Sequence, residues 1–266
     1  MDIKSAEVQQ FKVGAMKLEI YPTRELMGDA AARAAAEALK DLGRSNEIIA
    51  AIFATGASQL DTLESLTKIE GLPWDQVRGF HLDEYIGLPV DHLASFRGYL
   101  RRYLTSKVRM KEFFEVDGTA SDPEQVCRFY AEKLRSSEPQ LCLLGIGENG
   151  HLAFNDPGVA DFDDPADVKI VHLDAACRKQ QAAEGWFNTT EDVPEFAISL
   201  TIPTMLRVPK LIVSVPGSRK AEIMRRTLEE AISTECPATI LRTHPDVTVY
   251  LDRDSAAQLG ELIPYS

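Results

Sequence analysis

The sequence of 266 residues predicts an α/β protein: a Rossmann-like, doubly wound and mainly parallel sheet in a single domain with a covering flap. Strand-like and helix-like patterns alternate along the chain, which is typical of a parallel sheet with helices on both faces. Two strand-like segments, residues 48–54 and 141–146, are continuous apolar runs, as expected for strands buried on both faces. No internal repeat or interdomain linker interrupts the alternation, so we expect residues 1–266 to form one domain.

The expected elements begin with a strand at residues 17–21, and Thr23 is a suitable N-cap for the alanine-rich helix that follows it to about residue 42. Further helices are expected at residues 59–69, 95–104, 123–134 and 219–232, and further strands at residues 77–82, 197–202, 211–215 and 247–251. Residues 157–195 are acidic, rich in turn-forming residues and poorly periodic apart from a short strand at residues 168–173. We interpret them as the flap.

The composition is that of an acidic globular protein, with 44% hydrophobic and 26% charged residues. Its net charge of −12 argues against nucleic acid as a partner, because the phosphate backbone requires a basic surface. No apolar run reaches the roughly 20 residues of a membrane span, and the N-terminus lacks the apolar core of a signal peptide. The four cysteines are widely spaced and no histidines have metal-ligand spacing. We therefore expect a cytoplasmic protein with no metal and no membrane partner.

A glycine-rich turn after the strand at residues 141–146 carries the first candidate site. His151 follows this strand, with Asn149 and Gly150 just before it and Asp156 five residues later. Open α/β sheets bind their ligands at the carboxyl ends of their strands. A histidine there can exchange protons near neutral pH, and a neighbouring carboxylate can hold its tautomer. We therefore expect His151 to act as an acid–base group oriented by Asp156.

The same turn matches the pattern G-x-G-x-x-G over residues 145–150, which is typical of dinucleotide-binding turns. In such folds the pattern opens a helix, whereas the sequence Phe-Asn-Asp-Pro-Gly at residues 154–158 predicts another turn. The motif also follows several strand–helix units instead of the first. The sequence thus disfavours a dinucleotide site.

Two adjacent carboxylates, Asp83 and Glu84, follow the expected strand at residues 77–82. Successive residues of an extended chain point to opposite faces, so one of the two can face a ligand while the other makes structural contacts. An isolated Asp-Glu pair is more often a cap. Its place at the same sheet edge as His151 favours function here, with Asp83 as a candidate catalytic residue and Glu84 as a candidate binding residue.

Two strand–turn–helix junctions are suited to an anion such as phosphate. The first consists of Thr55, Gly56, Ala57 and Ser58. It combines backbone N–H groups with two hydroxyls at the start of a helix. The second, residues 217–220, has the same context and adds the cation Lys220. The alternatives are an ordinary capped turn and a solvated lysine.

With these residues placed, the chain resembles the glucosamine-6-phosphate deaminase (isomerase) family. The resemblance covers nearly the whole chain in order, through residues 55–56, 82–88, 147–157, 217–220 and 244–245. The segments 82–88 and 147–157 are the specific ones. The sister group, the 6-phosphogluconolactonases, typically has Asp-Glu-Arg where this chain has Asp-Glu-Tyr, and Gly-His-x-Ala-Ser where this chain has Gly-His-Leu-Ala-Phe-Asn.

The resemblance implies ring opening of an aminosugar 6-phosphate, isomerisation to the 2-keto sugar and release of ammonia, without a cofactor. It assigns Asp83 as the base that moves the C2 proton, and His151 to ring opening with help from Asn149 and Asp156. The substrate-binding residues would be Thr55, Gly56, Ala57, Ser58, Glu84, Gly150 and Lys220. The expected partner is this small sugar phosphate. Homo-oligomer formation and the sugar epimer stay open.

Three positions depart from the family pattern. Asn149 stands where many members have aspartate, and Asp156 stands where glutamate is usual. The flap lacks the phosphate-binding arginine that precedes an aromatic pair, and Arg178 and Lys179 are the candidates to replace it. Two other functions therefore stay open: a 6-phosphogluconolactonase-like sugar-phosphate hydrolase and a non-catalytic sugar-phosphate sensor.

Overall fold

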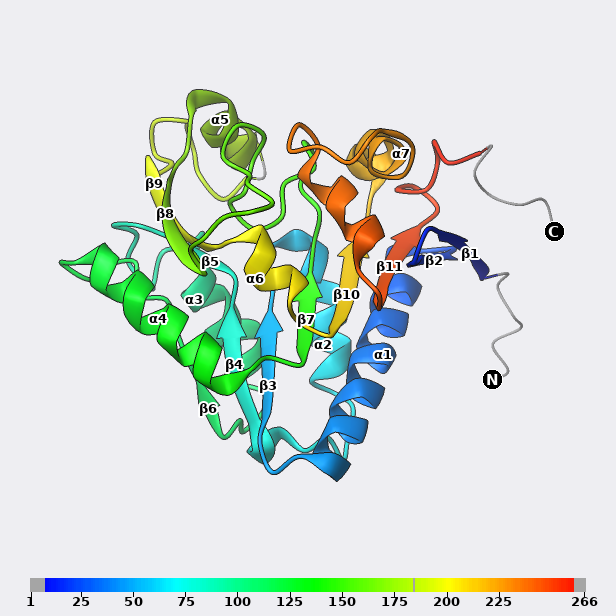
Figure 1. Cartoon of the computed structure of the whole chain (residues 1–266), viewed down its shortest axis with the longest axis horizontal. Coiled ribbons are helices and arrows are strands. Elements are labelled where there is room, and N and C mark those ends of the chain that lie inside the picture. The colour runs from blue at the N-terminus through cyan, green and yellow to red at the C-terminus, as the bar shows by residue number, and fades with distance from the viewer. Residues whose placement is uncertain (1–7, 184, 261–266) are drawn as a thin grey trace.

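An eight-stranded sheet runs through the centre of the structure, a computed structural model that describes residues 8–183 and 185–260 (Figure 1). In spatial order its strands are β1 (Gln9–Val13), β2 (Met16–Tyr21), β11 (Val247–Asp252), β10 (Lys210–Val215), β7 (Leu141–Leu144), β3 (Ile49–Phe53), β4 (Val77–His81) and β6 (Glu112–Phe113). Every neighbouring pair is parallel except β1 and β2. The mainly parallel sheet predicted from the sequence is thus confirmed, while β1 and β6 were not foreseen.

The chain reverses its direction of travel across the sheet between β3 and β7, which are neighbours. It leaves β3 toward β4 on one side and leaves β7 toward β10 on the other. The two connections therefore diverge and leave a crevice at the carboxyl ends of the strands, where open α/β sheets bind ligands. The arrows of β3, β7 and β10 all point to this edge in Figure 1.

Apolar side chains fill both faces of the sheet. Along β3, Ala50 and Ile52 belong to one buried cluster, whereas the alternate residues Ile49, Ala51 and Phe53 belong to the other. This alternation follows from the two-residue period of a strand. The run at residues 48–54 is apolar throughout because both faces of β3 are covered, as predicted for a doubly wound fold.

Helices cover the two faces in separate groups. One face carries α1 (Arg24–Ser45), η1 (Ala57–Gln59), α2 (Leu60–Leu66), η2 (Trp74–Gln76), α3 (Phe96–Leu100) and the π-helical turn η3 (Arg101–Thr105). The other face carries α4 (Pro123–Ser137), α6 (Ile202–Leu206), η4 (Ser218–Lys220), α7 (Ala221–Glu229) and η5 (Pro237–Thr243). Thr23 caps α1 as predicted, since its Oγ1 accepts a hydrogen bond from the Leu26 N–H at 3.3 Å. The helices expected at residues 59–69, 95–104 and 219–232 are shorter, because 3-10 or π turns take up one end of each.

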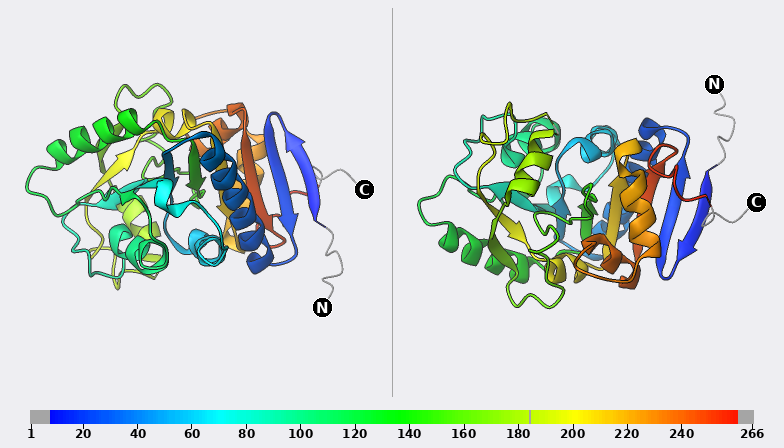
Figure 2. Two further views of the ribbon diagram at one scale, coloured as in Figure 1. Left: turned by 90° about the horizontal axis from the view of Figure 1, so that it is seen from below. Right: turned by 90° about the horizontal axis from the view of Figure 1, so that it is seen from above.

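The flap contains more regular structure than its sequence pattern predicts. It contains β8 (Val168–His172) and the helix α5 (Ala175–Ala183), and β8 joins a separate antiparallel sheet in the order β5 (Asp83–Tyr85), β9 (Phe196–Leu200) and β8. Residues 197–202, expected as a further strand, thus form part of this small sheet, which lies at the opposite end of the molecule from β1 and β2 (Figure 2). A third apolar cluster, which includes Tyr85, Phe154 and Phe187, lies beneath the flap.

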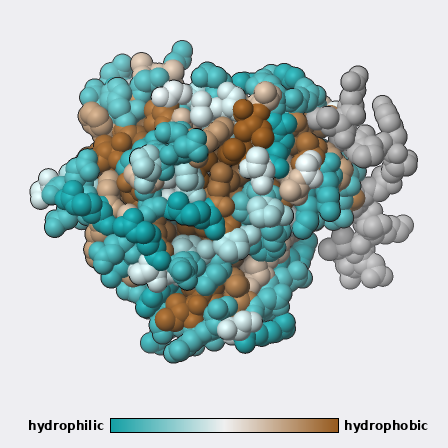
Figure 3. Space-filling view, viewed as in Figure 1, coloured by the Kyte–Doolittle hydropathy of each residue, from teal (hydrophilic) through white to brown (hydrophobic). Residues whose placement is uncertain are grey.

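The surface shows no continuous apolar face in the view of Figure 3, where hydrophobic residues appear as patches among hydrophilic ones. Within residues 8–183 and 185–260, none of the helices combines the length and hydropathy needed to cross a membrane.

Candidate active site

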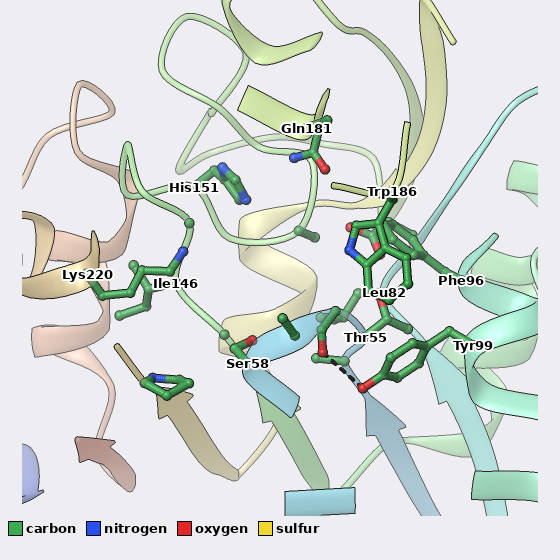
Figure 4. A pocket seen from close by; sticks show the side chains of 18 of the residues that line it. Thr55, Ser58, Leu82, Phe96, Tyr99, Ile146, His151, Gln181, Trp186 and Lys220 are labelled. Carbon is green, nitrogen blue, oxygen red and sulfur yellow. Dashed lines mark hydrogen bonds between the residues drawn. The ribbon is translucent and has the colours of Figure 1, made fainter. Parts of the chain in front are cut away.

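A pocket of about 360 Å³ opens at the carboxyl edge of the central sheet. The turns that follow β3, β4, β7 and β10 form its floor and sides. Phe96 and Tyr99 of α3 close one side, and Gln181 of α5 and Trp186 of the flap lie above it (Figure 4). The pocket therefore lies at the crevice that the strand order predicts.

His151 belongs to a hydrogen-bonded group of three side chains. Its Nδ1 lies 2.8 Å from Asn149 Oδ1 and 3.2 Å from Asp156 Oδ1. The Asn149 amide also donates from Nδ2 to Asp156 Oδ1 at 2.7 Å. Because both oxygens that face Nδ1 are acceptors, Nδ1 carries the proton, and Nε2 is left as the nitrogen that can accept one.

The Asp156 carboxylate is held ionised by its neighbours. Burial alone raises its pKa, but the charge of His151 and the hydrogen bonds from His151, Asn149 and Cys177 outweigh burial and lower the pKa to about 2. Asp156 therefore orients His151 as a permanent negative charge at neutral pH.

Two glycines shape the histidine turn. A Cβ on Gly147 would lie 2.1 Å from His151 Cε1, so only glycine leaves room for the imidazole ring. Gly150 has a φ of +89°, and a Cβ there would lie 3.0 Å from the Sγ of Cys236. Within the described part of the chain, Gly150 is not among the residues that line the pocket. Its positive φ and close packing give it a role in forming the turn, and its contact with the substrate stays a prediction.

Asp83 lines the pocket from the first position of β5, with 8% of its surface exposed. Burial and the charges of Glu84 and Asp156 raise its pKa well above the usual aspartate value. Its backbone carbonyl accepts a hydrogen bond from Nδ1 of the buried His81 at 2.9 Å. His81 Nε2 accepts in turn from the Val116 N–H at 2.8 Å, which fixes the histidine tautomer. Asp83 is thus a desolvated carboxylate on a fixed backbone, as a base for carbon acids requires.

Glu84 points away from the pocket and supports α3. Its carboxylate accepts hydrogen bonds from the hydroxyl of Ser95 and from the backbone N–H groups of Tyr85, Phe96 and Arg97. It is fully buried, and Arg97 Nε lies 3.5 Å from its Oε2. All these partners belong to the protein, so the assignment of Glu84 as a substrate-binding residue is wrong. The alternation argument correctly predicted that only one of the two carboxylates faces the ligand.

The two anion-binding turns lie on adjoining sides of the pocket and share a geometry. Gly56 and Gly217 have φ values of +87° and +91°, and a 3-10 turn follows each of them. The Tyr99 hydroxyl donates to the Gly56 carbonyl at 2.9 Å and holds the first turn. All four residues from Thr55 to Ser58 line the pocket, and the Lys220 ammonium points into it from the second turn (Figure 4).

Sequence reasoning missed the cation Arg24, in the first turn of α1. It lines the pocket, and its guanidinium donates to the Ala57 carbonyl and to the Asp61 carboxylate. The sequence feature that identified Lys220, a cation at the start of a helix that follows a strand, is present at Arg24 too. Arg178, offered as a replacement for the flap arginine, is instead bonded to the backbone carbonyls of Thr190, Glu191 and Val193.

Two further features were weighed from the sequence. Turns, and no helix, follow residue 150 up to residue 158, as the sequence of this segment predicts. Within the described ranges, no group of three or more His, Cys, Asp or Glu side chains is arranged to hold a metal ion.

The fold and the pocket are those of an enzyme of the Rossmann-like α/β class, with Asp83, His151 and two glycine-containing turns at one sheet edge. A sequence profile described as glucosamine-6-phosphate isomerases/6-phosphogluconolactonase matches residues 22–250, and the chain belongs to this family. The chain is 36% identical over 211 residues to a glucosamine-6-phosphate deaminase of Bacillus cereus strain B4264, which covers 79% of this chain and 78% of the relative. It is 37% identical over 209 residues to that of Exiguobacterium sibiricum, with 79% and 81% covered.

Solved structures agree with this assignment. The fold superposes on a monomeric glucosamine-6-phosphate deaminase with a TM-score of 0.82 at 31% identity, over 91% of this chain and 99% of that one. It superposes on the 6-phosphogluconolactonase of Trypanosoma brucei with a TM-score of 0.74 at 20% identity, over 91% and 98%. The second likeness shows a shared fold. The resemblance and the fold class predicted from the sequence are both confirmed.

Proposed function

We propose that this chain converts glucosamine 6-phosphate and water, or a close aminosugar analogue, into fructose 6-phosphate and ammonia. One observation carries the proposal: the buried carboxylate of Asp83 and the imidazole of His151 line one pocket, together with two anion-binding turns and Lys220. An isomerisation of a phosphorylated sugar requires these parts, namely a base, a proton shuttle and a phosphate site. Relatives at 36% and 37% identity carry the name glucosamine-6-phosphate deaminase, which supports the proposal.

In the proposed reaction the phosphate binds to the N–H groups of residues 55–58 and to Lys220. Arg24 adds a second cation at the same turn. His151 Nε2 takes the proton of the anomeric hydroxyl, and the ring oxygen is protonated as the ring opens to the aldehyde. Asn149 and Asp156 keep the imidazole in the required tautomer.

Asp83 then removes the proton from C2, next to the aldehyde carbonyl, while the aldehyde oxygen takes a proton to give an enolamine, and a proton is returned at C1. The C2 amine becomes an imine by this transfer. Water adds to the imine carbon and ammonia leaves, which gives the 2-keto sugar. A carboxylate whose pKa is raised by burial is a stronger base than one in water, so the environment of Asp83 suits the step.

The proposal is tested by ammonia release from glucosamine 6-phosphate, with unphosphorylated glucosamine as the matched control. Exchange of the C2 proton for solvent deuterium reports the action of Asp83 separately. Ammonia release that depends on the phosphate is the expected result. Acid release from 6-phosphogluconolactone without ammonia would instead establish the hydrolase, and tight binding without turnover would establish the sensor.

A further inference from the structure

The side chain of Cys177 on the flap helix α5 contacts the histidine group. Its Sγ lies 3.3 Å from Asp156 Oδ2 and donates to it, while Asp156 Oδ1 accepts from Asn149 and faces His151. The two carboxylate oxygens thus have separate partners. A buried ionised carboxylate requires such donors, because each unsatisfied oxygen would be left without its hydration.

The same face of α5 also reaches the substrate pocket. Cys177 and Gln181 are four residues apart, so they lie one turn apart on one side of the helix, and both are buried. Gln181 lines the pocket, and its Oε1 accepts a hydrogen bond from the Tyr85 hydroxyl at 2.9 Å. The backbone of Cys177 is fixed by its N–H, which donates to Asp174 Oδ1 at 2.8 Å. One face of α5 therefore contacts the pocket through Gln181 and contacts Asp156, the partner of His151, through Cys177.

We propose that Cys177 is a positioning residue, whose thiol holds Asp156 and thereby links the orientation of His151 to the seating of α5 over the pocket. The competing explanation is packing alone, since Cys177 also belongs to the apolar cluster beneath the flap and buried cysteines often act as small hydrophobes. The two explanations predict opposite outcomes for two substitutions, one that keeps a donor and one that keeps an apolar side chain.

Cys177→Ser keeps a donor and Cys177→Val keeps an apolar filling. If the thiol positions Asp156, the serine variant retains kcat/KM for ammonia release within about twofold, and the valine variant loses roughly three- to tenfold. If packing alone matters, the order is reversed, because the serine buries a hydroxyl among apolar groups. Cys127→Val is the matched control, since Cys127 is equally buried on α4 and makes no contact with the histidine group.

The second readout does not require turnover. The groups of the described residues that face Asp156 are His151 from its own turn, Cys177 from α5 and Asp83 from β5. Without the thiol proton, more of the negative charge of Asp156 acts on protonated His151. The titration midpoint of His151, followed by NMR and assigned by its loss in His151→Gln, should rise by roughly 0.3–1 pH unit in Cys177→Val. It should stay in place in the serine variant and in the Cys127 control.

The measurement of kcat/KM depends on the proposed function, whereas the NMR titration of His151 does not. A wild-type chain that releases no ammonia would refute the proposed function and leave the NMR comparison to decide on Cys177. An unchanged His151 midpoint in Cys177→Val, with loss in the serine variant, would overturn the positioning role. Should valine prevent folding, Cys177→Ala removes the donor without added bulk and is judged by the same midpoint.

Discussion

Two buried aspartates at the same sheet edge have opposite properties. Asp83 and Asp156 are 8% and 6% exposed, yet the pKa of Asp83 is raised and that of Asp156 is lowered to about 2. Burial raises the pKa of both carboxyl groups, so the opposite directions of the two shifts come from their neighbours. Asp156 faces a histidine, an amide and a thiol, whereas the charges that act on Asp83 are the carboxylates of Glu84 and Asp156 itself.

This contrast separates two chemical roles. A carboxylate surrounded by donors stays ionised and holds its partner, but it is a poor base. A carboxylate that lacks such compensation binds a proton readily and can remove one from carbon. The charge of Asp156 also raises the pKa of Asp83, so the residue that orients the histidine strengthens the base.

The largest effect is expected at Asp83. Asp83→Asn removes the base without changing its volume, so kcat should fall by roughly 10³-fold or more with little change in KM. The C2 deuterium exchange of the wild type should disappear with it. Exchange at a near-normal rate would show that another group moves the C2 proton, and the comparison between the two aspartates would lose its functional meaning.

The same variant tests the raised pKa through stability. The folded state binds the Asp83 proton more tightly than the unfolded state, so its favourable contribution is complete below the unfolded pKa and is lost as pH rises through the folded one. Asp83→Asn should therefore stabilise the fold more at pH 8 than at pH 4. Urea unfolding at both pH values measures this, and an equal effect at both would contradict the raised pKa.

A smaller loss of activity is expected when Asp156 is replaced. Asp156→Asn keeps the shape but removes the charge that orients His151, so kcat/KM should fall by roughly 10²-fold.

The lowered pKa of Asp156 contributes stability that is present above pH 4 and is lost as pH falls toward 2. The wild type should therefore lose roughly 1.5–2 kcal/mol more than the variant over this interval. Parallel acid unfolding curves for the two proteins would argue against the assigned hydrogen-bond partners.

A substitution in the proposed phosphate site should weaken substrate binding and leave the chemical step nearly unchanged. Lys220→Ala removes a cation that points into the pocket while both aspartates stay in place (Figure 4). We expect KM to rise by about 10- to 100-fold, the equivalent of roughly 1.5–3 kcal/mol for a charge-assisted hydrogen bond, with kcat nearly unchanged. Lys40→Ala, at an exposed position of α1, is the control. An equal KM in both variants would mean that Lys220 does not bind the phosphate.

The smallest effect concerns Asn149, which bridges His151 and Asp156. An aspartate there adds negative charge beside Nδ1 and favours the imidazolium. The acidic limb of the kcat/KM–pH profile should move to higher pH in Asn149→Asp, by less than about one unit, because the two carboxylates would share a proton. If the acidic limb does not move, although His151 is still required for activity in the variant, then residue 149 has no electrostatic effect on His151.

The sequence predicted the parts of the fold that depend on local patterns. The buried strands β3 and β7 are continuous apolar runs, and α1 begins at the expected cap, Thr23. The helix α5 was missed because its buried residues are only Cys177 and Gln181, one of them polar, so its sequence shows no amphipathic period. The short strand β5 was missed because its hydrogen bonds come from β9, which lies more than a hundred residues away.

The site shows the same division. His151, Asp83 and the two turns line one pocket as expected, because each was selected from a short segment that follows a strand. Arg24 escaped because only the tertiary fold brings the first turn of α1 beside residues 55–58. Glu84 was misassigned because alternation predicts that one of two neighbours faces inward without saying which, and the donors that occupy Glu84 belong to α3.

The short strand β5 belongs to the flap sheet, yet Leu82 alone separates it from β4 of the central sheet. Asp83 pairs with Ser199 of β9, and the Leu82 carbonyl accepts from the Leu200 N–H at 2.8 Å. Peeling this sheet away to admit a sugar would pull the base out of place. A movement of α5 for substrate entry would leave Asp83 in place, whereas a movement of β5 and β9 would not. Amide hydrogen exchange should be fast in α5 and slow across β5 and β9.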